Sequence, residues 1–297
     1  MANQADEARS LSLMRSKAYL TYEMLEDAML LPFPEYKNVI EHATILRIGP
    51  LVEYAYHHYQ ELPTCLAHLN SPAVNLVLNT FRQRITVDTS ITARPVEFAK
   101  APQSPQSVDD PNWIAFCLRF VDAGMKAGLT KSFAQALVST FEEMCGNLLD
   151  HSQRVSSGLV GYMWRRGEFE YVVADAGIGV LQSLRQHPDY SFLTDSGEAL
   201  ETALTDGESR HGRDQQRGTG FNKLMFNIAQ RNSYLRFRSG DHSLSIDGTL
   251  PTPLKKTAPC APFEGFLISV ISRSKKALAA ALTVLTMLTE DNEHATD

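Results

Sequence analysis

The sequence predicts an α+β protein: a two-layer α/β sandwich, with helices on one face of a mostly antiparallel sheet, preceded by a mostly helical N-terminal region. Apolar residues recur at helical spacing from residue 133 to residue 148. Short strand-like runs alternate with helical runs from residue 158 onward. A linker-like segment separates these elements from the N-terminal part of the chain. These observations predict the fold class.

The N-terminal part reads as mostly helical. Residues 1–30 carry apolar side chains at mixed helical spacing, and the prolines of 31–34 then interrupt the pattern. Further helix is expected within 36–69. Short strands are expected at 74–78 and 85–87. No pattern in these residues indicates a particular chemistry.

The segment 101–111 is the predicted domain boundary. It contains three prolines and no large apolar residue except Val108, which is typical of a linker. We therefore expect an N-terminal regulatory or interaction region at 1–105. A ligand-binding domain is expected at 106–275, followed by a C-terminal helix and tail at 276–297.

The second half alternates helices and strands. The first helix is expected at 113–125 and the second after Thr130, a residue of the N-cap type. Further helices are expected at 180–186, 197–204, 221–229 and 274–289. Strands are expected at 158–164, 170–174, 234–238, 243–246 and 266–272, with a turn at Arg166-Gly167.

Composition argues against several classes of protein. The net charge of −6 and the pI near 5.9 give no general attraction to nucleic acid, so direct nucleic-acid binding is not expected. No run reaches the roughly 18 apolar residues of a membrane-spanning helix, and the N-terminus lacks a secretory signal pattern. The four cysteines are scattered, as is typical of reduced thiols. We expect a cytoplasmic protein.

The first motif lies on the helix after Thr130. Glu143, Asn147 and His151 are spaced i, i+4, i+8 and therefore share one face of that helix. A carboxamide oxygen is a hard ligand for Mg²⁺, and a neighbouring carboxylate can accept a proton from water. Taken alone, the same spacing is also typical of a solvated polar face.

The second motif is D-x-G-x-G at a strand end, formed by Asp175, Gly177 and Gly179 around Ile178. Glycine permits positive φ and a close approach of the backbone to a planar ligand. An aspartate at the end of a buried strand can accept a hydrogen bond from an exocyclic amine such as that of adenine. An ordinary strand-to-helix turn is the alternative interpretation.

The third motif is a G-x-G at the start of a predicted helix. Free backbone amides and the positive end of a helix are suited to phosphate oxygens, and nearby arginines can neutralise phosphate charge. A surface loop is the alternative interpretation. The P-loop pattern is absent from the sequence. The residues concerned are Arg213, Arg217, Gly218, Thr219, Gly220 and Phe221.

In this order, the three motifs resemble those of the GHKL ATPase superfamily, which includes gyrases and histidine kinases. The E-x-x-x-N-x-x-x-H spacing is similar to the family's N-box in anti-sigma-factor kinases. The other two motifs are similar to its two glycine boxes. The resemblance covers about residues 113–273 and implies a Bergerat-type ATP-binding fold. The family's usual Leu-Gly after the second glycine box is Phe221-Asn222 here.

The resemblance implies ATP and Mg²⁺ as cofactors. Asn147 would coordinate Mg²⁺, and Glu143 would polarise the attacking water or hydroxyl. Asp175 would recognise the adenine amine. The glycines and Ile178 of the first glycine box would shape the purine pocket. The third motif would hold the phosphates. The family's last-strand glycine is expected at Gly265 rather than Gly248, which makes 249–263 an insertion.

The sequence leaves three possible uses of the bound ATP. No phospho-acceptor box of a sensor histidine kinase occurs in the sequence. We expect an ATP-driven conformational switch with slow ATP hydrolysis, acting on a protein partner or within a homodimer. A serine/threonine kinase of the anti-sigma-factor type and a non-hydrolysing nucleotide-binding scaffold are the alternatives. The presence of both Glu143 and Asn147 argues against the scaffold.

Overall fold

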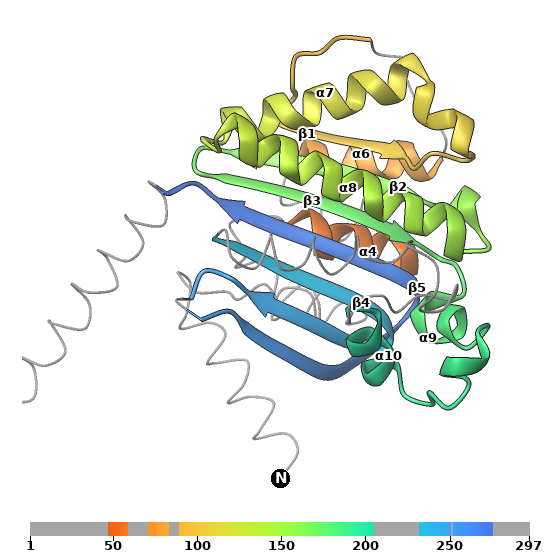
Figure 1. Ribbon diagram of the computed structural model, residues 1–297. Helices are drawn as coiled ribbons and strands as arrows, with labels where there is room; N and C mark the ends of the chain where they lie inside the picture. The colour runs from red at the N-terminus through yellow and green to blue at the C-terminus, as the bar shows by residue number, and fades with distance from the viewer. Residues whose placement is uncertain (1–46, 59–70, 83–88, 205–231, 251, 276–297) are drawn as a thin grey trace, which may run out of the picture.

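A five-stranded sheet forms the centre of the computed structural model (Figure 1), which describes residues 47–58, 71–82, 89–204, 232–250 and 252–275. The strand order is β1-β2-β3-β5-β4, and every neighbouring pair is antiparallel. The predicted α+β class with an antiparallel sheet is therefore confirmed. The strands are β1 (Val96–Lys100), β2 (Leu159–Arg165), β3 (Glu168–Asp175), β4 (Ser233–Asp247) and β5 (Leu254–Arg273).

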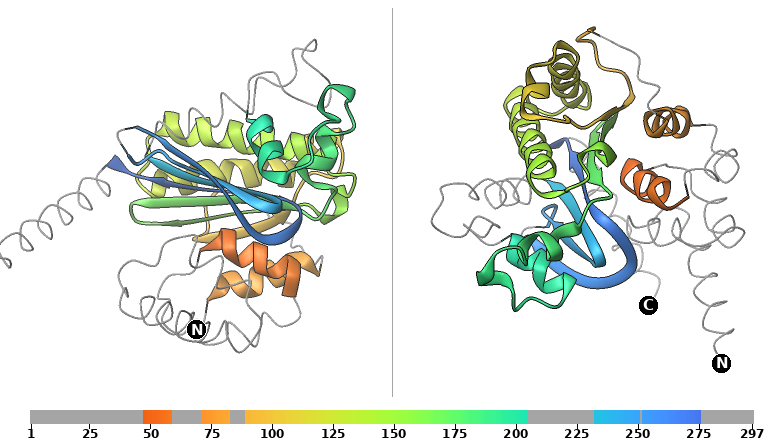
Figure 2. Two further views of the ribbon diagram at one scale, coloured as in Figure 1. Left: turned by 90° about the horizontal axis from the view of Figure 1, so that it is seen from below. Right: turned by 90° about the vertical axis from the view of Figure 1, so that its right-hand side faces the viewer.

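Helices cover both faces of this sheet (Figure 2). The longer helices α7 and α8 lie on one face, together with α10, and α4 and α6 lie on the other. The sheet with α7, α8 and α10 agrees with the expected sandwich, while α4 and α6 add a layer of helices on the other face, which was not predicted. The α-helices are α4 (Ile48–His58), α6 (Pro72–Phe81), α7 (Pro111–Lys126), α8 (Lys131–His151), α9 (Gly179–Leu184) and α10 (Ser196–Ala203).

The starts of α7 and α8 follow from local side-chain chemistry. The Asp110 carboxylate accepts a hydrogen bond from Asn112 N at 2.7 Å, and Pro111 occupies the first turn, where no amide donor is needed. Thr130 Oγ1 accepts from Phe133 N at 3.3 Å, as its residue type predicted. Both caps begin helices whose apolar stripes face the sheet.

The core between α7, α8 and the sheet is rich in aromatic side chains. The ring centroid of Phe120 lies 4.8 Å from those of both Phe141 and Phe169, so the two helices and strand β3 meet at one ring. Such ring pairs add about 1 kcal/mol each beyond the buried area. The packing fixes α8 against the strand that ends at Asp175.

The sheet extends across the predicted boundary between residues 105 and 106. Strand β1 precedes that boundary and pairs with β2, which follows it. The carboxylate of Glu97 on β1 accepts hydrogen bonds from Arg119 of α7 at 2.6 and 2.9 Å. It also accepts one from the Tyr162 hydroxyl of β2 at 2.6 Å.

One sequence prediction of local structure is wrong. Residues 74–78 lie in helix α6 rather than in a strand, because Ser71 caps the helix and Pro72 occupies its first turn. The segment 249–263, expected to be an insertion relative to the family, is largely strand, since β5 begins at Leu254 and pairs with β4 as a long hairpin; whether it is an insertion stays a prediction. The predicted elements at 85–87, 221–229 and most of 274–289 lie outside the described residues.

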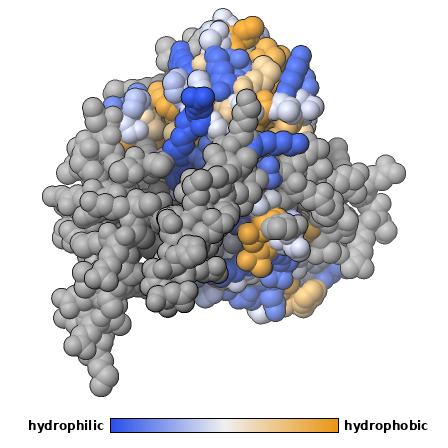
Figure 3. Space-filling model, turned by 90° about the vertical axis from the view of Figure 1, so that its left-hand side faces the viewer, coloured by the Kyte–Doolittle hydropathy of each residue, from blue (hydrophilic) through white to orange (hydrophobic). Residues whose placement is uncertain are grey.

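The surface of the described residues is mixed in character. In the view of Figure 3, hydrophilic residues are interspersed with apolar ones over this part of the surface. Within the same residues, no helix has both the length and the apolar character needed to cross a membrane.

Candidate functional site

Asp175 is the centre of the candidate site. It ends strand β3, its side chain is fully buried, and its Oδ1 accepts a hydrogen bond from Gly177 N at 2.6 Å. Its Oδ2 makes no well-formed hydrogen bond with the described residues, although the Ser152 side chain and the Phe266 backbone donate toward the carboxyl group. Burial raises the pKa of this carboxyl to about 6, although Gly177, Ser152 and Phe266 act in the opposite direction.

Glycines let the backbone pack closely around Asp175 and the loop that follows it. A Cβ on Gly177 would lie 2.2 Å from Ser152 O, which is closer than real Cβ contacts. Gly179 has φ of +74°, and Gly265 of β5 has φ of +88°. A Cβ on Gly265 would lie 2.1 Å from Asp175 O. Gly265 therefore contacts the aspartate, and its assignment as the family's last-strand glycine stays a prediction.

Serines hold the loop after Asp175. Ala176 N donates to Ser157 Oγ at 3.0 Å, and Val180 N donates to Ser239 Oγ at 2.9 Å. Ser239 Oγ in turn donates to Gly265 O at 2.7 Å, which joins the loop to strands β4 and β5. Sequence analysis missed these serines, because each acts on a residue distant in sequence and none belongs to a recognisable motif.

Helix α8 and the glycine loop are in direct contact. Ile178 N donates to Ser152 O at 3.0 Å, at the C-terminal end of α8. His151 Nδ1 lies 3.3 Å from Ser183 Oγ of α9, the helix that follows the loop. The structure therefore brings the C-terminal end of the first motif's helix to the second motif.

Glu143 and Asn147 lie further along α8. Glu143 is exposed and Asn147 is half-buried, while the apolar residues between them pack into the core. Within the described part of the chain, no side-chain hydrogen bond or ion pair involves either residue. An exposed carboxylate and a half-buried carboxamide thus lie one turn apart on this face of α8.

The third motif is outside the described residues. This applies to Arg213, Arg217, Gly218, Thr219, Gly220 and Phe221. Their expected role in phosphate binding stays a prediction.

A hollow of about 450 Å³ adjoins the glycine loop. Its lining includes Ile178 together with Gln182 and Arg185 of the α9 region. Neither Asp175 nor Asn147 lines it, so the hollow does not contain the groups expected to recognise adenine and metal.

The described site can accept a hydrogen bond in a buried place and present a carboxylate and a carboxamide on one helix. A buried acceptor without a donor costs about 1–3 kcal/mol, which a ligand that donates to it can relieve. Comparison of the chain with protein-family models, curated proteins and solved structures finds no match to any of them.

Proposed function

We propose that this chain binds Mg·ATP at a GHKL-type site and acts as an ATP-driven conformational switch with slow ATP hydrolysis. The observation that carries the proposal is the buried Asp175 carboxylate. One oxygen is held by the Gly177 amide, and the other makes no well-formed hydrogen bond with the described residues. The exocyclic amine of adenine is a donor of the kind that this oxygen lacks.

The loop around Asp175 supports the purine assignment. Gly177 and Gly179 keep their positions free of side chains, and the loop's amides are fixed by hydrogen bonds to Ser152, Ser157 and Ser239. A pocket whose polar groups are already oriented loses little conformational entropy when a rigid base binds. Ile178, held at its amide by α8, would contact the base.

Residues of helix α8 support the proposed binding of Mg²⁺ and of the ATP phosphates. Asn147 would bind the Mg²⁺ and Glu143 would take a proton from water, and neither side chain is engaged by another described residue. When bound, Mg·ATP supplies the phosphoanhydride bond and the charge neutralisation that its cleavage requires. The second glycine segment, Gly218 to Gly220, and the arginines before it would bind phosphate oxygens.

A conformational switch requires a surface whose contacts with another protein differ between its two states. Helix α7 exposes Ile114, Leu118 and Met125, whose side chains are 47%, 50% and 39% exposed and share one helical face. Exposed apolar side chains in a row favour contact with another protein surface. They support a protein partner or a second copy of the chain.

One observation favours a second function. Because Glu143 is exposed, a hydroxyl group of a partner protein can approach it as readily as water. A serine/threonine kinase of the anti-sigma-factor type would use Glu143 as the base on that hydroxyl. The two functions share the nucleotide site and differ only in the acceptor.

Incubation with ATP labelled at the γ-phosphate tests the proposal. The protein is incubated with Mg²⁺ alone and then in the presence of cell extract. Release of free labelled phosphate by the purified chain supports the slow hydrolysis. Label on another protein, without free phosphate from the purified chain, supports the kinase. Label in neither form, with no ATP retained on the chain, contradicts both.

A further inference from the structure

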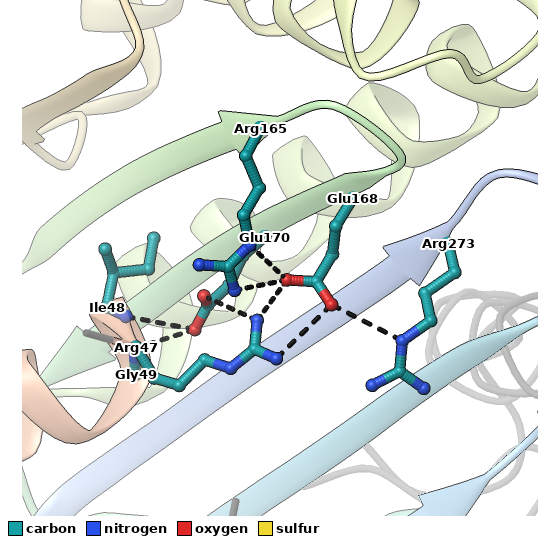
Figure 4. Close-up of polar contacts among 7 residues, drawn as sticks. All are labelled: Arg47, Ile48, Gly49, Arg165, Glu168, Glu170 and Arg273. Carbon is teal, nitrogen blue, oxygen red and sulfur yellow. Dashed lines mark hydrogen bonds and ion pairs between the residues drawn. The ribbon is translucent and has the colours of Figure 1, made fainter. Parts of the chain in front are cut away.

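Helix α4 is docked on the back of the sheet through buried charges. The carboxylate of Glu170 on β3 accepts hydrogen bonds from Ile48 N at 3.0 Å and Gly49 N at 3.2 Å, at the first turn of α4 (Figure 4). An anion at this position is favoured by the partial positive charge of a helix N-terminus. In the middle of α4, the buried Glu53 forms an ion pair with the buried Arg238 of β4.

A second group of charges holds the residue before α4. The Glu168 carboxylate is approached by Arg47, Arg165 and Arg273 (Figure 4). Burial would raise the pKa of Glu168, but the neighbouring Arg47 and Arg165 lower it to about 2. Glu168 therefore remains charged at neutral pH, and the N-terminal end of α4 has a fixed position on β3.

The C-terminal turn of α4 reaches the strand end that carries Asp175. The Tyr56 hydroxyl lies 2.7 Å from Ser157 O and 3.0 Å from Ala174 O, and it donates its proton to this pair of carbonyl oxygens. Burial, and then the nearby Asp175 carboxylate, raise the pKa of Tyr56, so the hydroxyl keeps its proton. Its ring packs edge-on against Phe263 of β5.

Tyr56 therefore contacts the backbone before Asp175 directly and the backbone after it through Ser157. Ala174 precedes the aspartate. Ser157 follows the contact further, because Tyr56 donates to its carbonyl oxygen. The side-chain Oγ of Ser157 accepts a hydrogen bond from Ala176 N at 3.0 Å. The chain of contacts runs from α4 through one tyrosine and one serine to the residues that flank the carboxylate.

We infer that Tyr56 is a positioning residue for Asp175, and that helix α4 thereby couples the N-terminal part of the chain to the nucleotide site. For nucleotide recognition, this coupling rests on the function proposed above. Binding that requires the oriented carboxylate stabilises the docked position of α4, and displacement of α4 weakens that binding by the same factor. The tyrosine acts through the aspartate and does not touch the ligand.

Tyr56→Phe tests this role with a matched control. Tyr171 is on the same strand as Asp175, and its buried hydroxyl has no hydrogen-bond partner among the described residues. Tyr171→Phe thus removes the same atom without removing a contact. Ser157→Ala removes the hydrogen bond between Ser157 Oγ and Ala176 N. It should weaken ATP binding, as Tyr56→Phe does.

The first measurement compares binding of ATP and of ITP, which has a carbonyl in place of the exocyclic amine. Wild-type protein should bind ATP more tightly than ITP. Tyr56→Phe should weaken ATP binding about fivefold, from the loss of one hydrogen bond, and leave ITP binding nearly unchanged. Tyr171→Phe should preserve both affinities. An equal loss for both nucleotides, or no loss, would overturn the role of Tyr56 in positioning.

The second measurement separates this role from the proposed function. Amide hydrogen exchange at Ala176 and Gly177 is followed in nucleotide-free protein. It should be about fivefold faster in Tyr56→Phe and Ser157→Ala than in wild type or Tyr171→Phe. Unchanged exchange overturns the positioning role. If wild-type protein binds neither nucleotide, the proposed function fails, and the exchange rates alone decide the role of Tyr56.

Discussion

Asp175→Asn replaces a buried titrating group with a neutral one of nearly the same shape. Burial raises the pKa of Asp175 from its ordinary value of 3.8 to about 6. A difference of about two units corresponds to about 3 kcal/mol of folding free energy. The amide oxygen can still accept the hydrogen bond from Gly177 N, but the side chain cannot ionise.

The sign of the pH effect follows from the raised pKa. The folded state holds the Asp175 proton more tightly than the unfolded state, so the associated stability is fully present below about pH 4. It is lost as the pH rises through about 6. Between pH 4.5 and pH 8, the wild-type protein should lose about 2 kcal/mol that Asp175→Asn does not lose.

Urea unfolding of nucleotide-free protein at pH 4.5 and pH 8 measures this effect. The free energy of unfolding of Asp175→Asn, relative to wild type, should rise by about 2 kcal/mol between the two pH values. Asp150→Asn, at an exposed position on α8, should keep the pH dependence of the wild type. If the free energy of unfolding differs between Asp175→Asn and wild type by the same amount at both pH values, the buried, titrating aspartate is refuted.

Three further substitutions test other parts of the structure. Glu143→Ala should retain ATP but slow phosphate release about 100-fold, through loss of the base. Gly265→Ala should destabilise the fold by about 3 kcal/mol in urea unfolding, because its Cβ would lie 2.1 Å from Asp175 O at a φ of +88°. Glu53→Ala should cost about 3–5 kcal/mol by the same measurement, since it removes an ion-pair partner of the buried Arg238.

Each of these has an outcome that contradicts it. Glu142→Ala removes the adjacent exposed carboxylate, about 100° away around the helix, and should retain turnover. Equal turnover in Glu143→Ala and Glu142→Ala would remove Glu143 from its role. Wild-type stability of Gly265→Ala would contradict the close approach of β5 to β3. A loss below about 1 kcal/mol in Glu53→Ala would contradict the buried pair.

Local patterns predicted the elements that are determined locally. The cap at Thr130 and the apolar stripe after it predicted α8, and a glycine turn at Gly167 predicted the hairpin of β2 and β3. The position of α4 could not be predicted, because it depends on contacts such as that between Ile48 and Glu170, which are 122 residues apart. The same applies to the third layer that α4 and α6 form.

The sequence predicted part of the candidate site, as it predicted part of the fold. The burial of Asp175 at a strand end and the glycines after it followed from the sequence, because they belong to one continuous segment. Ser239 and Tyr56 did not, since an ordinary serine or tyrosine gives no local sign of the distant amide or carbonyl that it contacts. The motif therefore predicted the acid but not the residues that hold it in place.

Calorimetric titration with Mg·AMP-PNP, a non-hydrolysable ATP analogue, tests the central claim most directly. The wild-type chain should bind one equivalent. Asp175→Asn should bind at least about 100-fold more weakly, because an amide donor would then face the adenine amine. No binding by the wild-type chain, or equal affinity in the two proteins, would contradict recognition of adenine by Asp175.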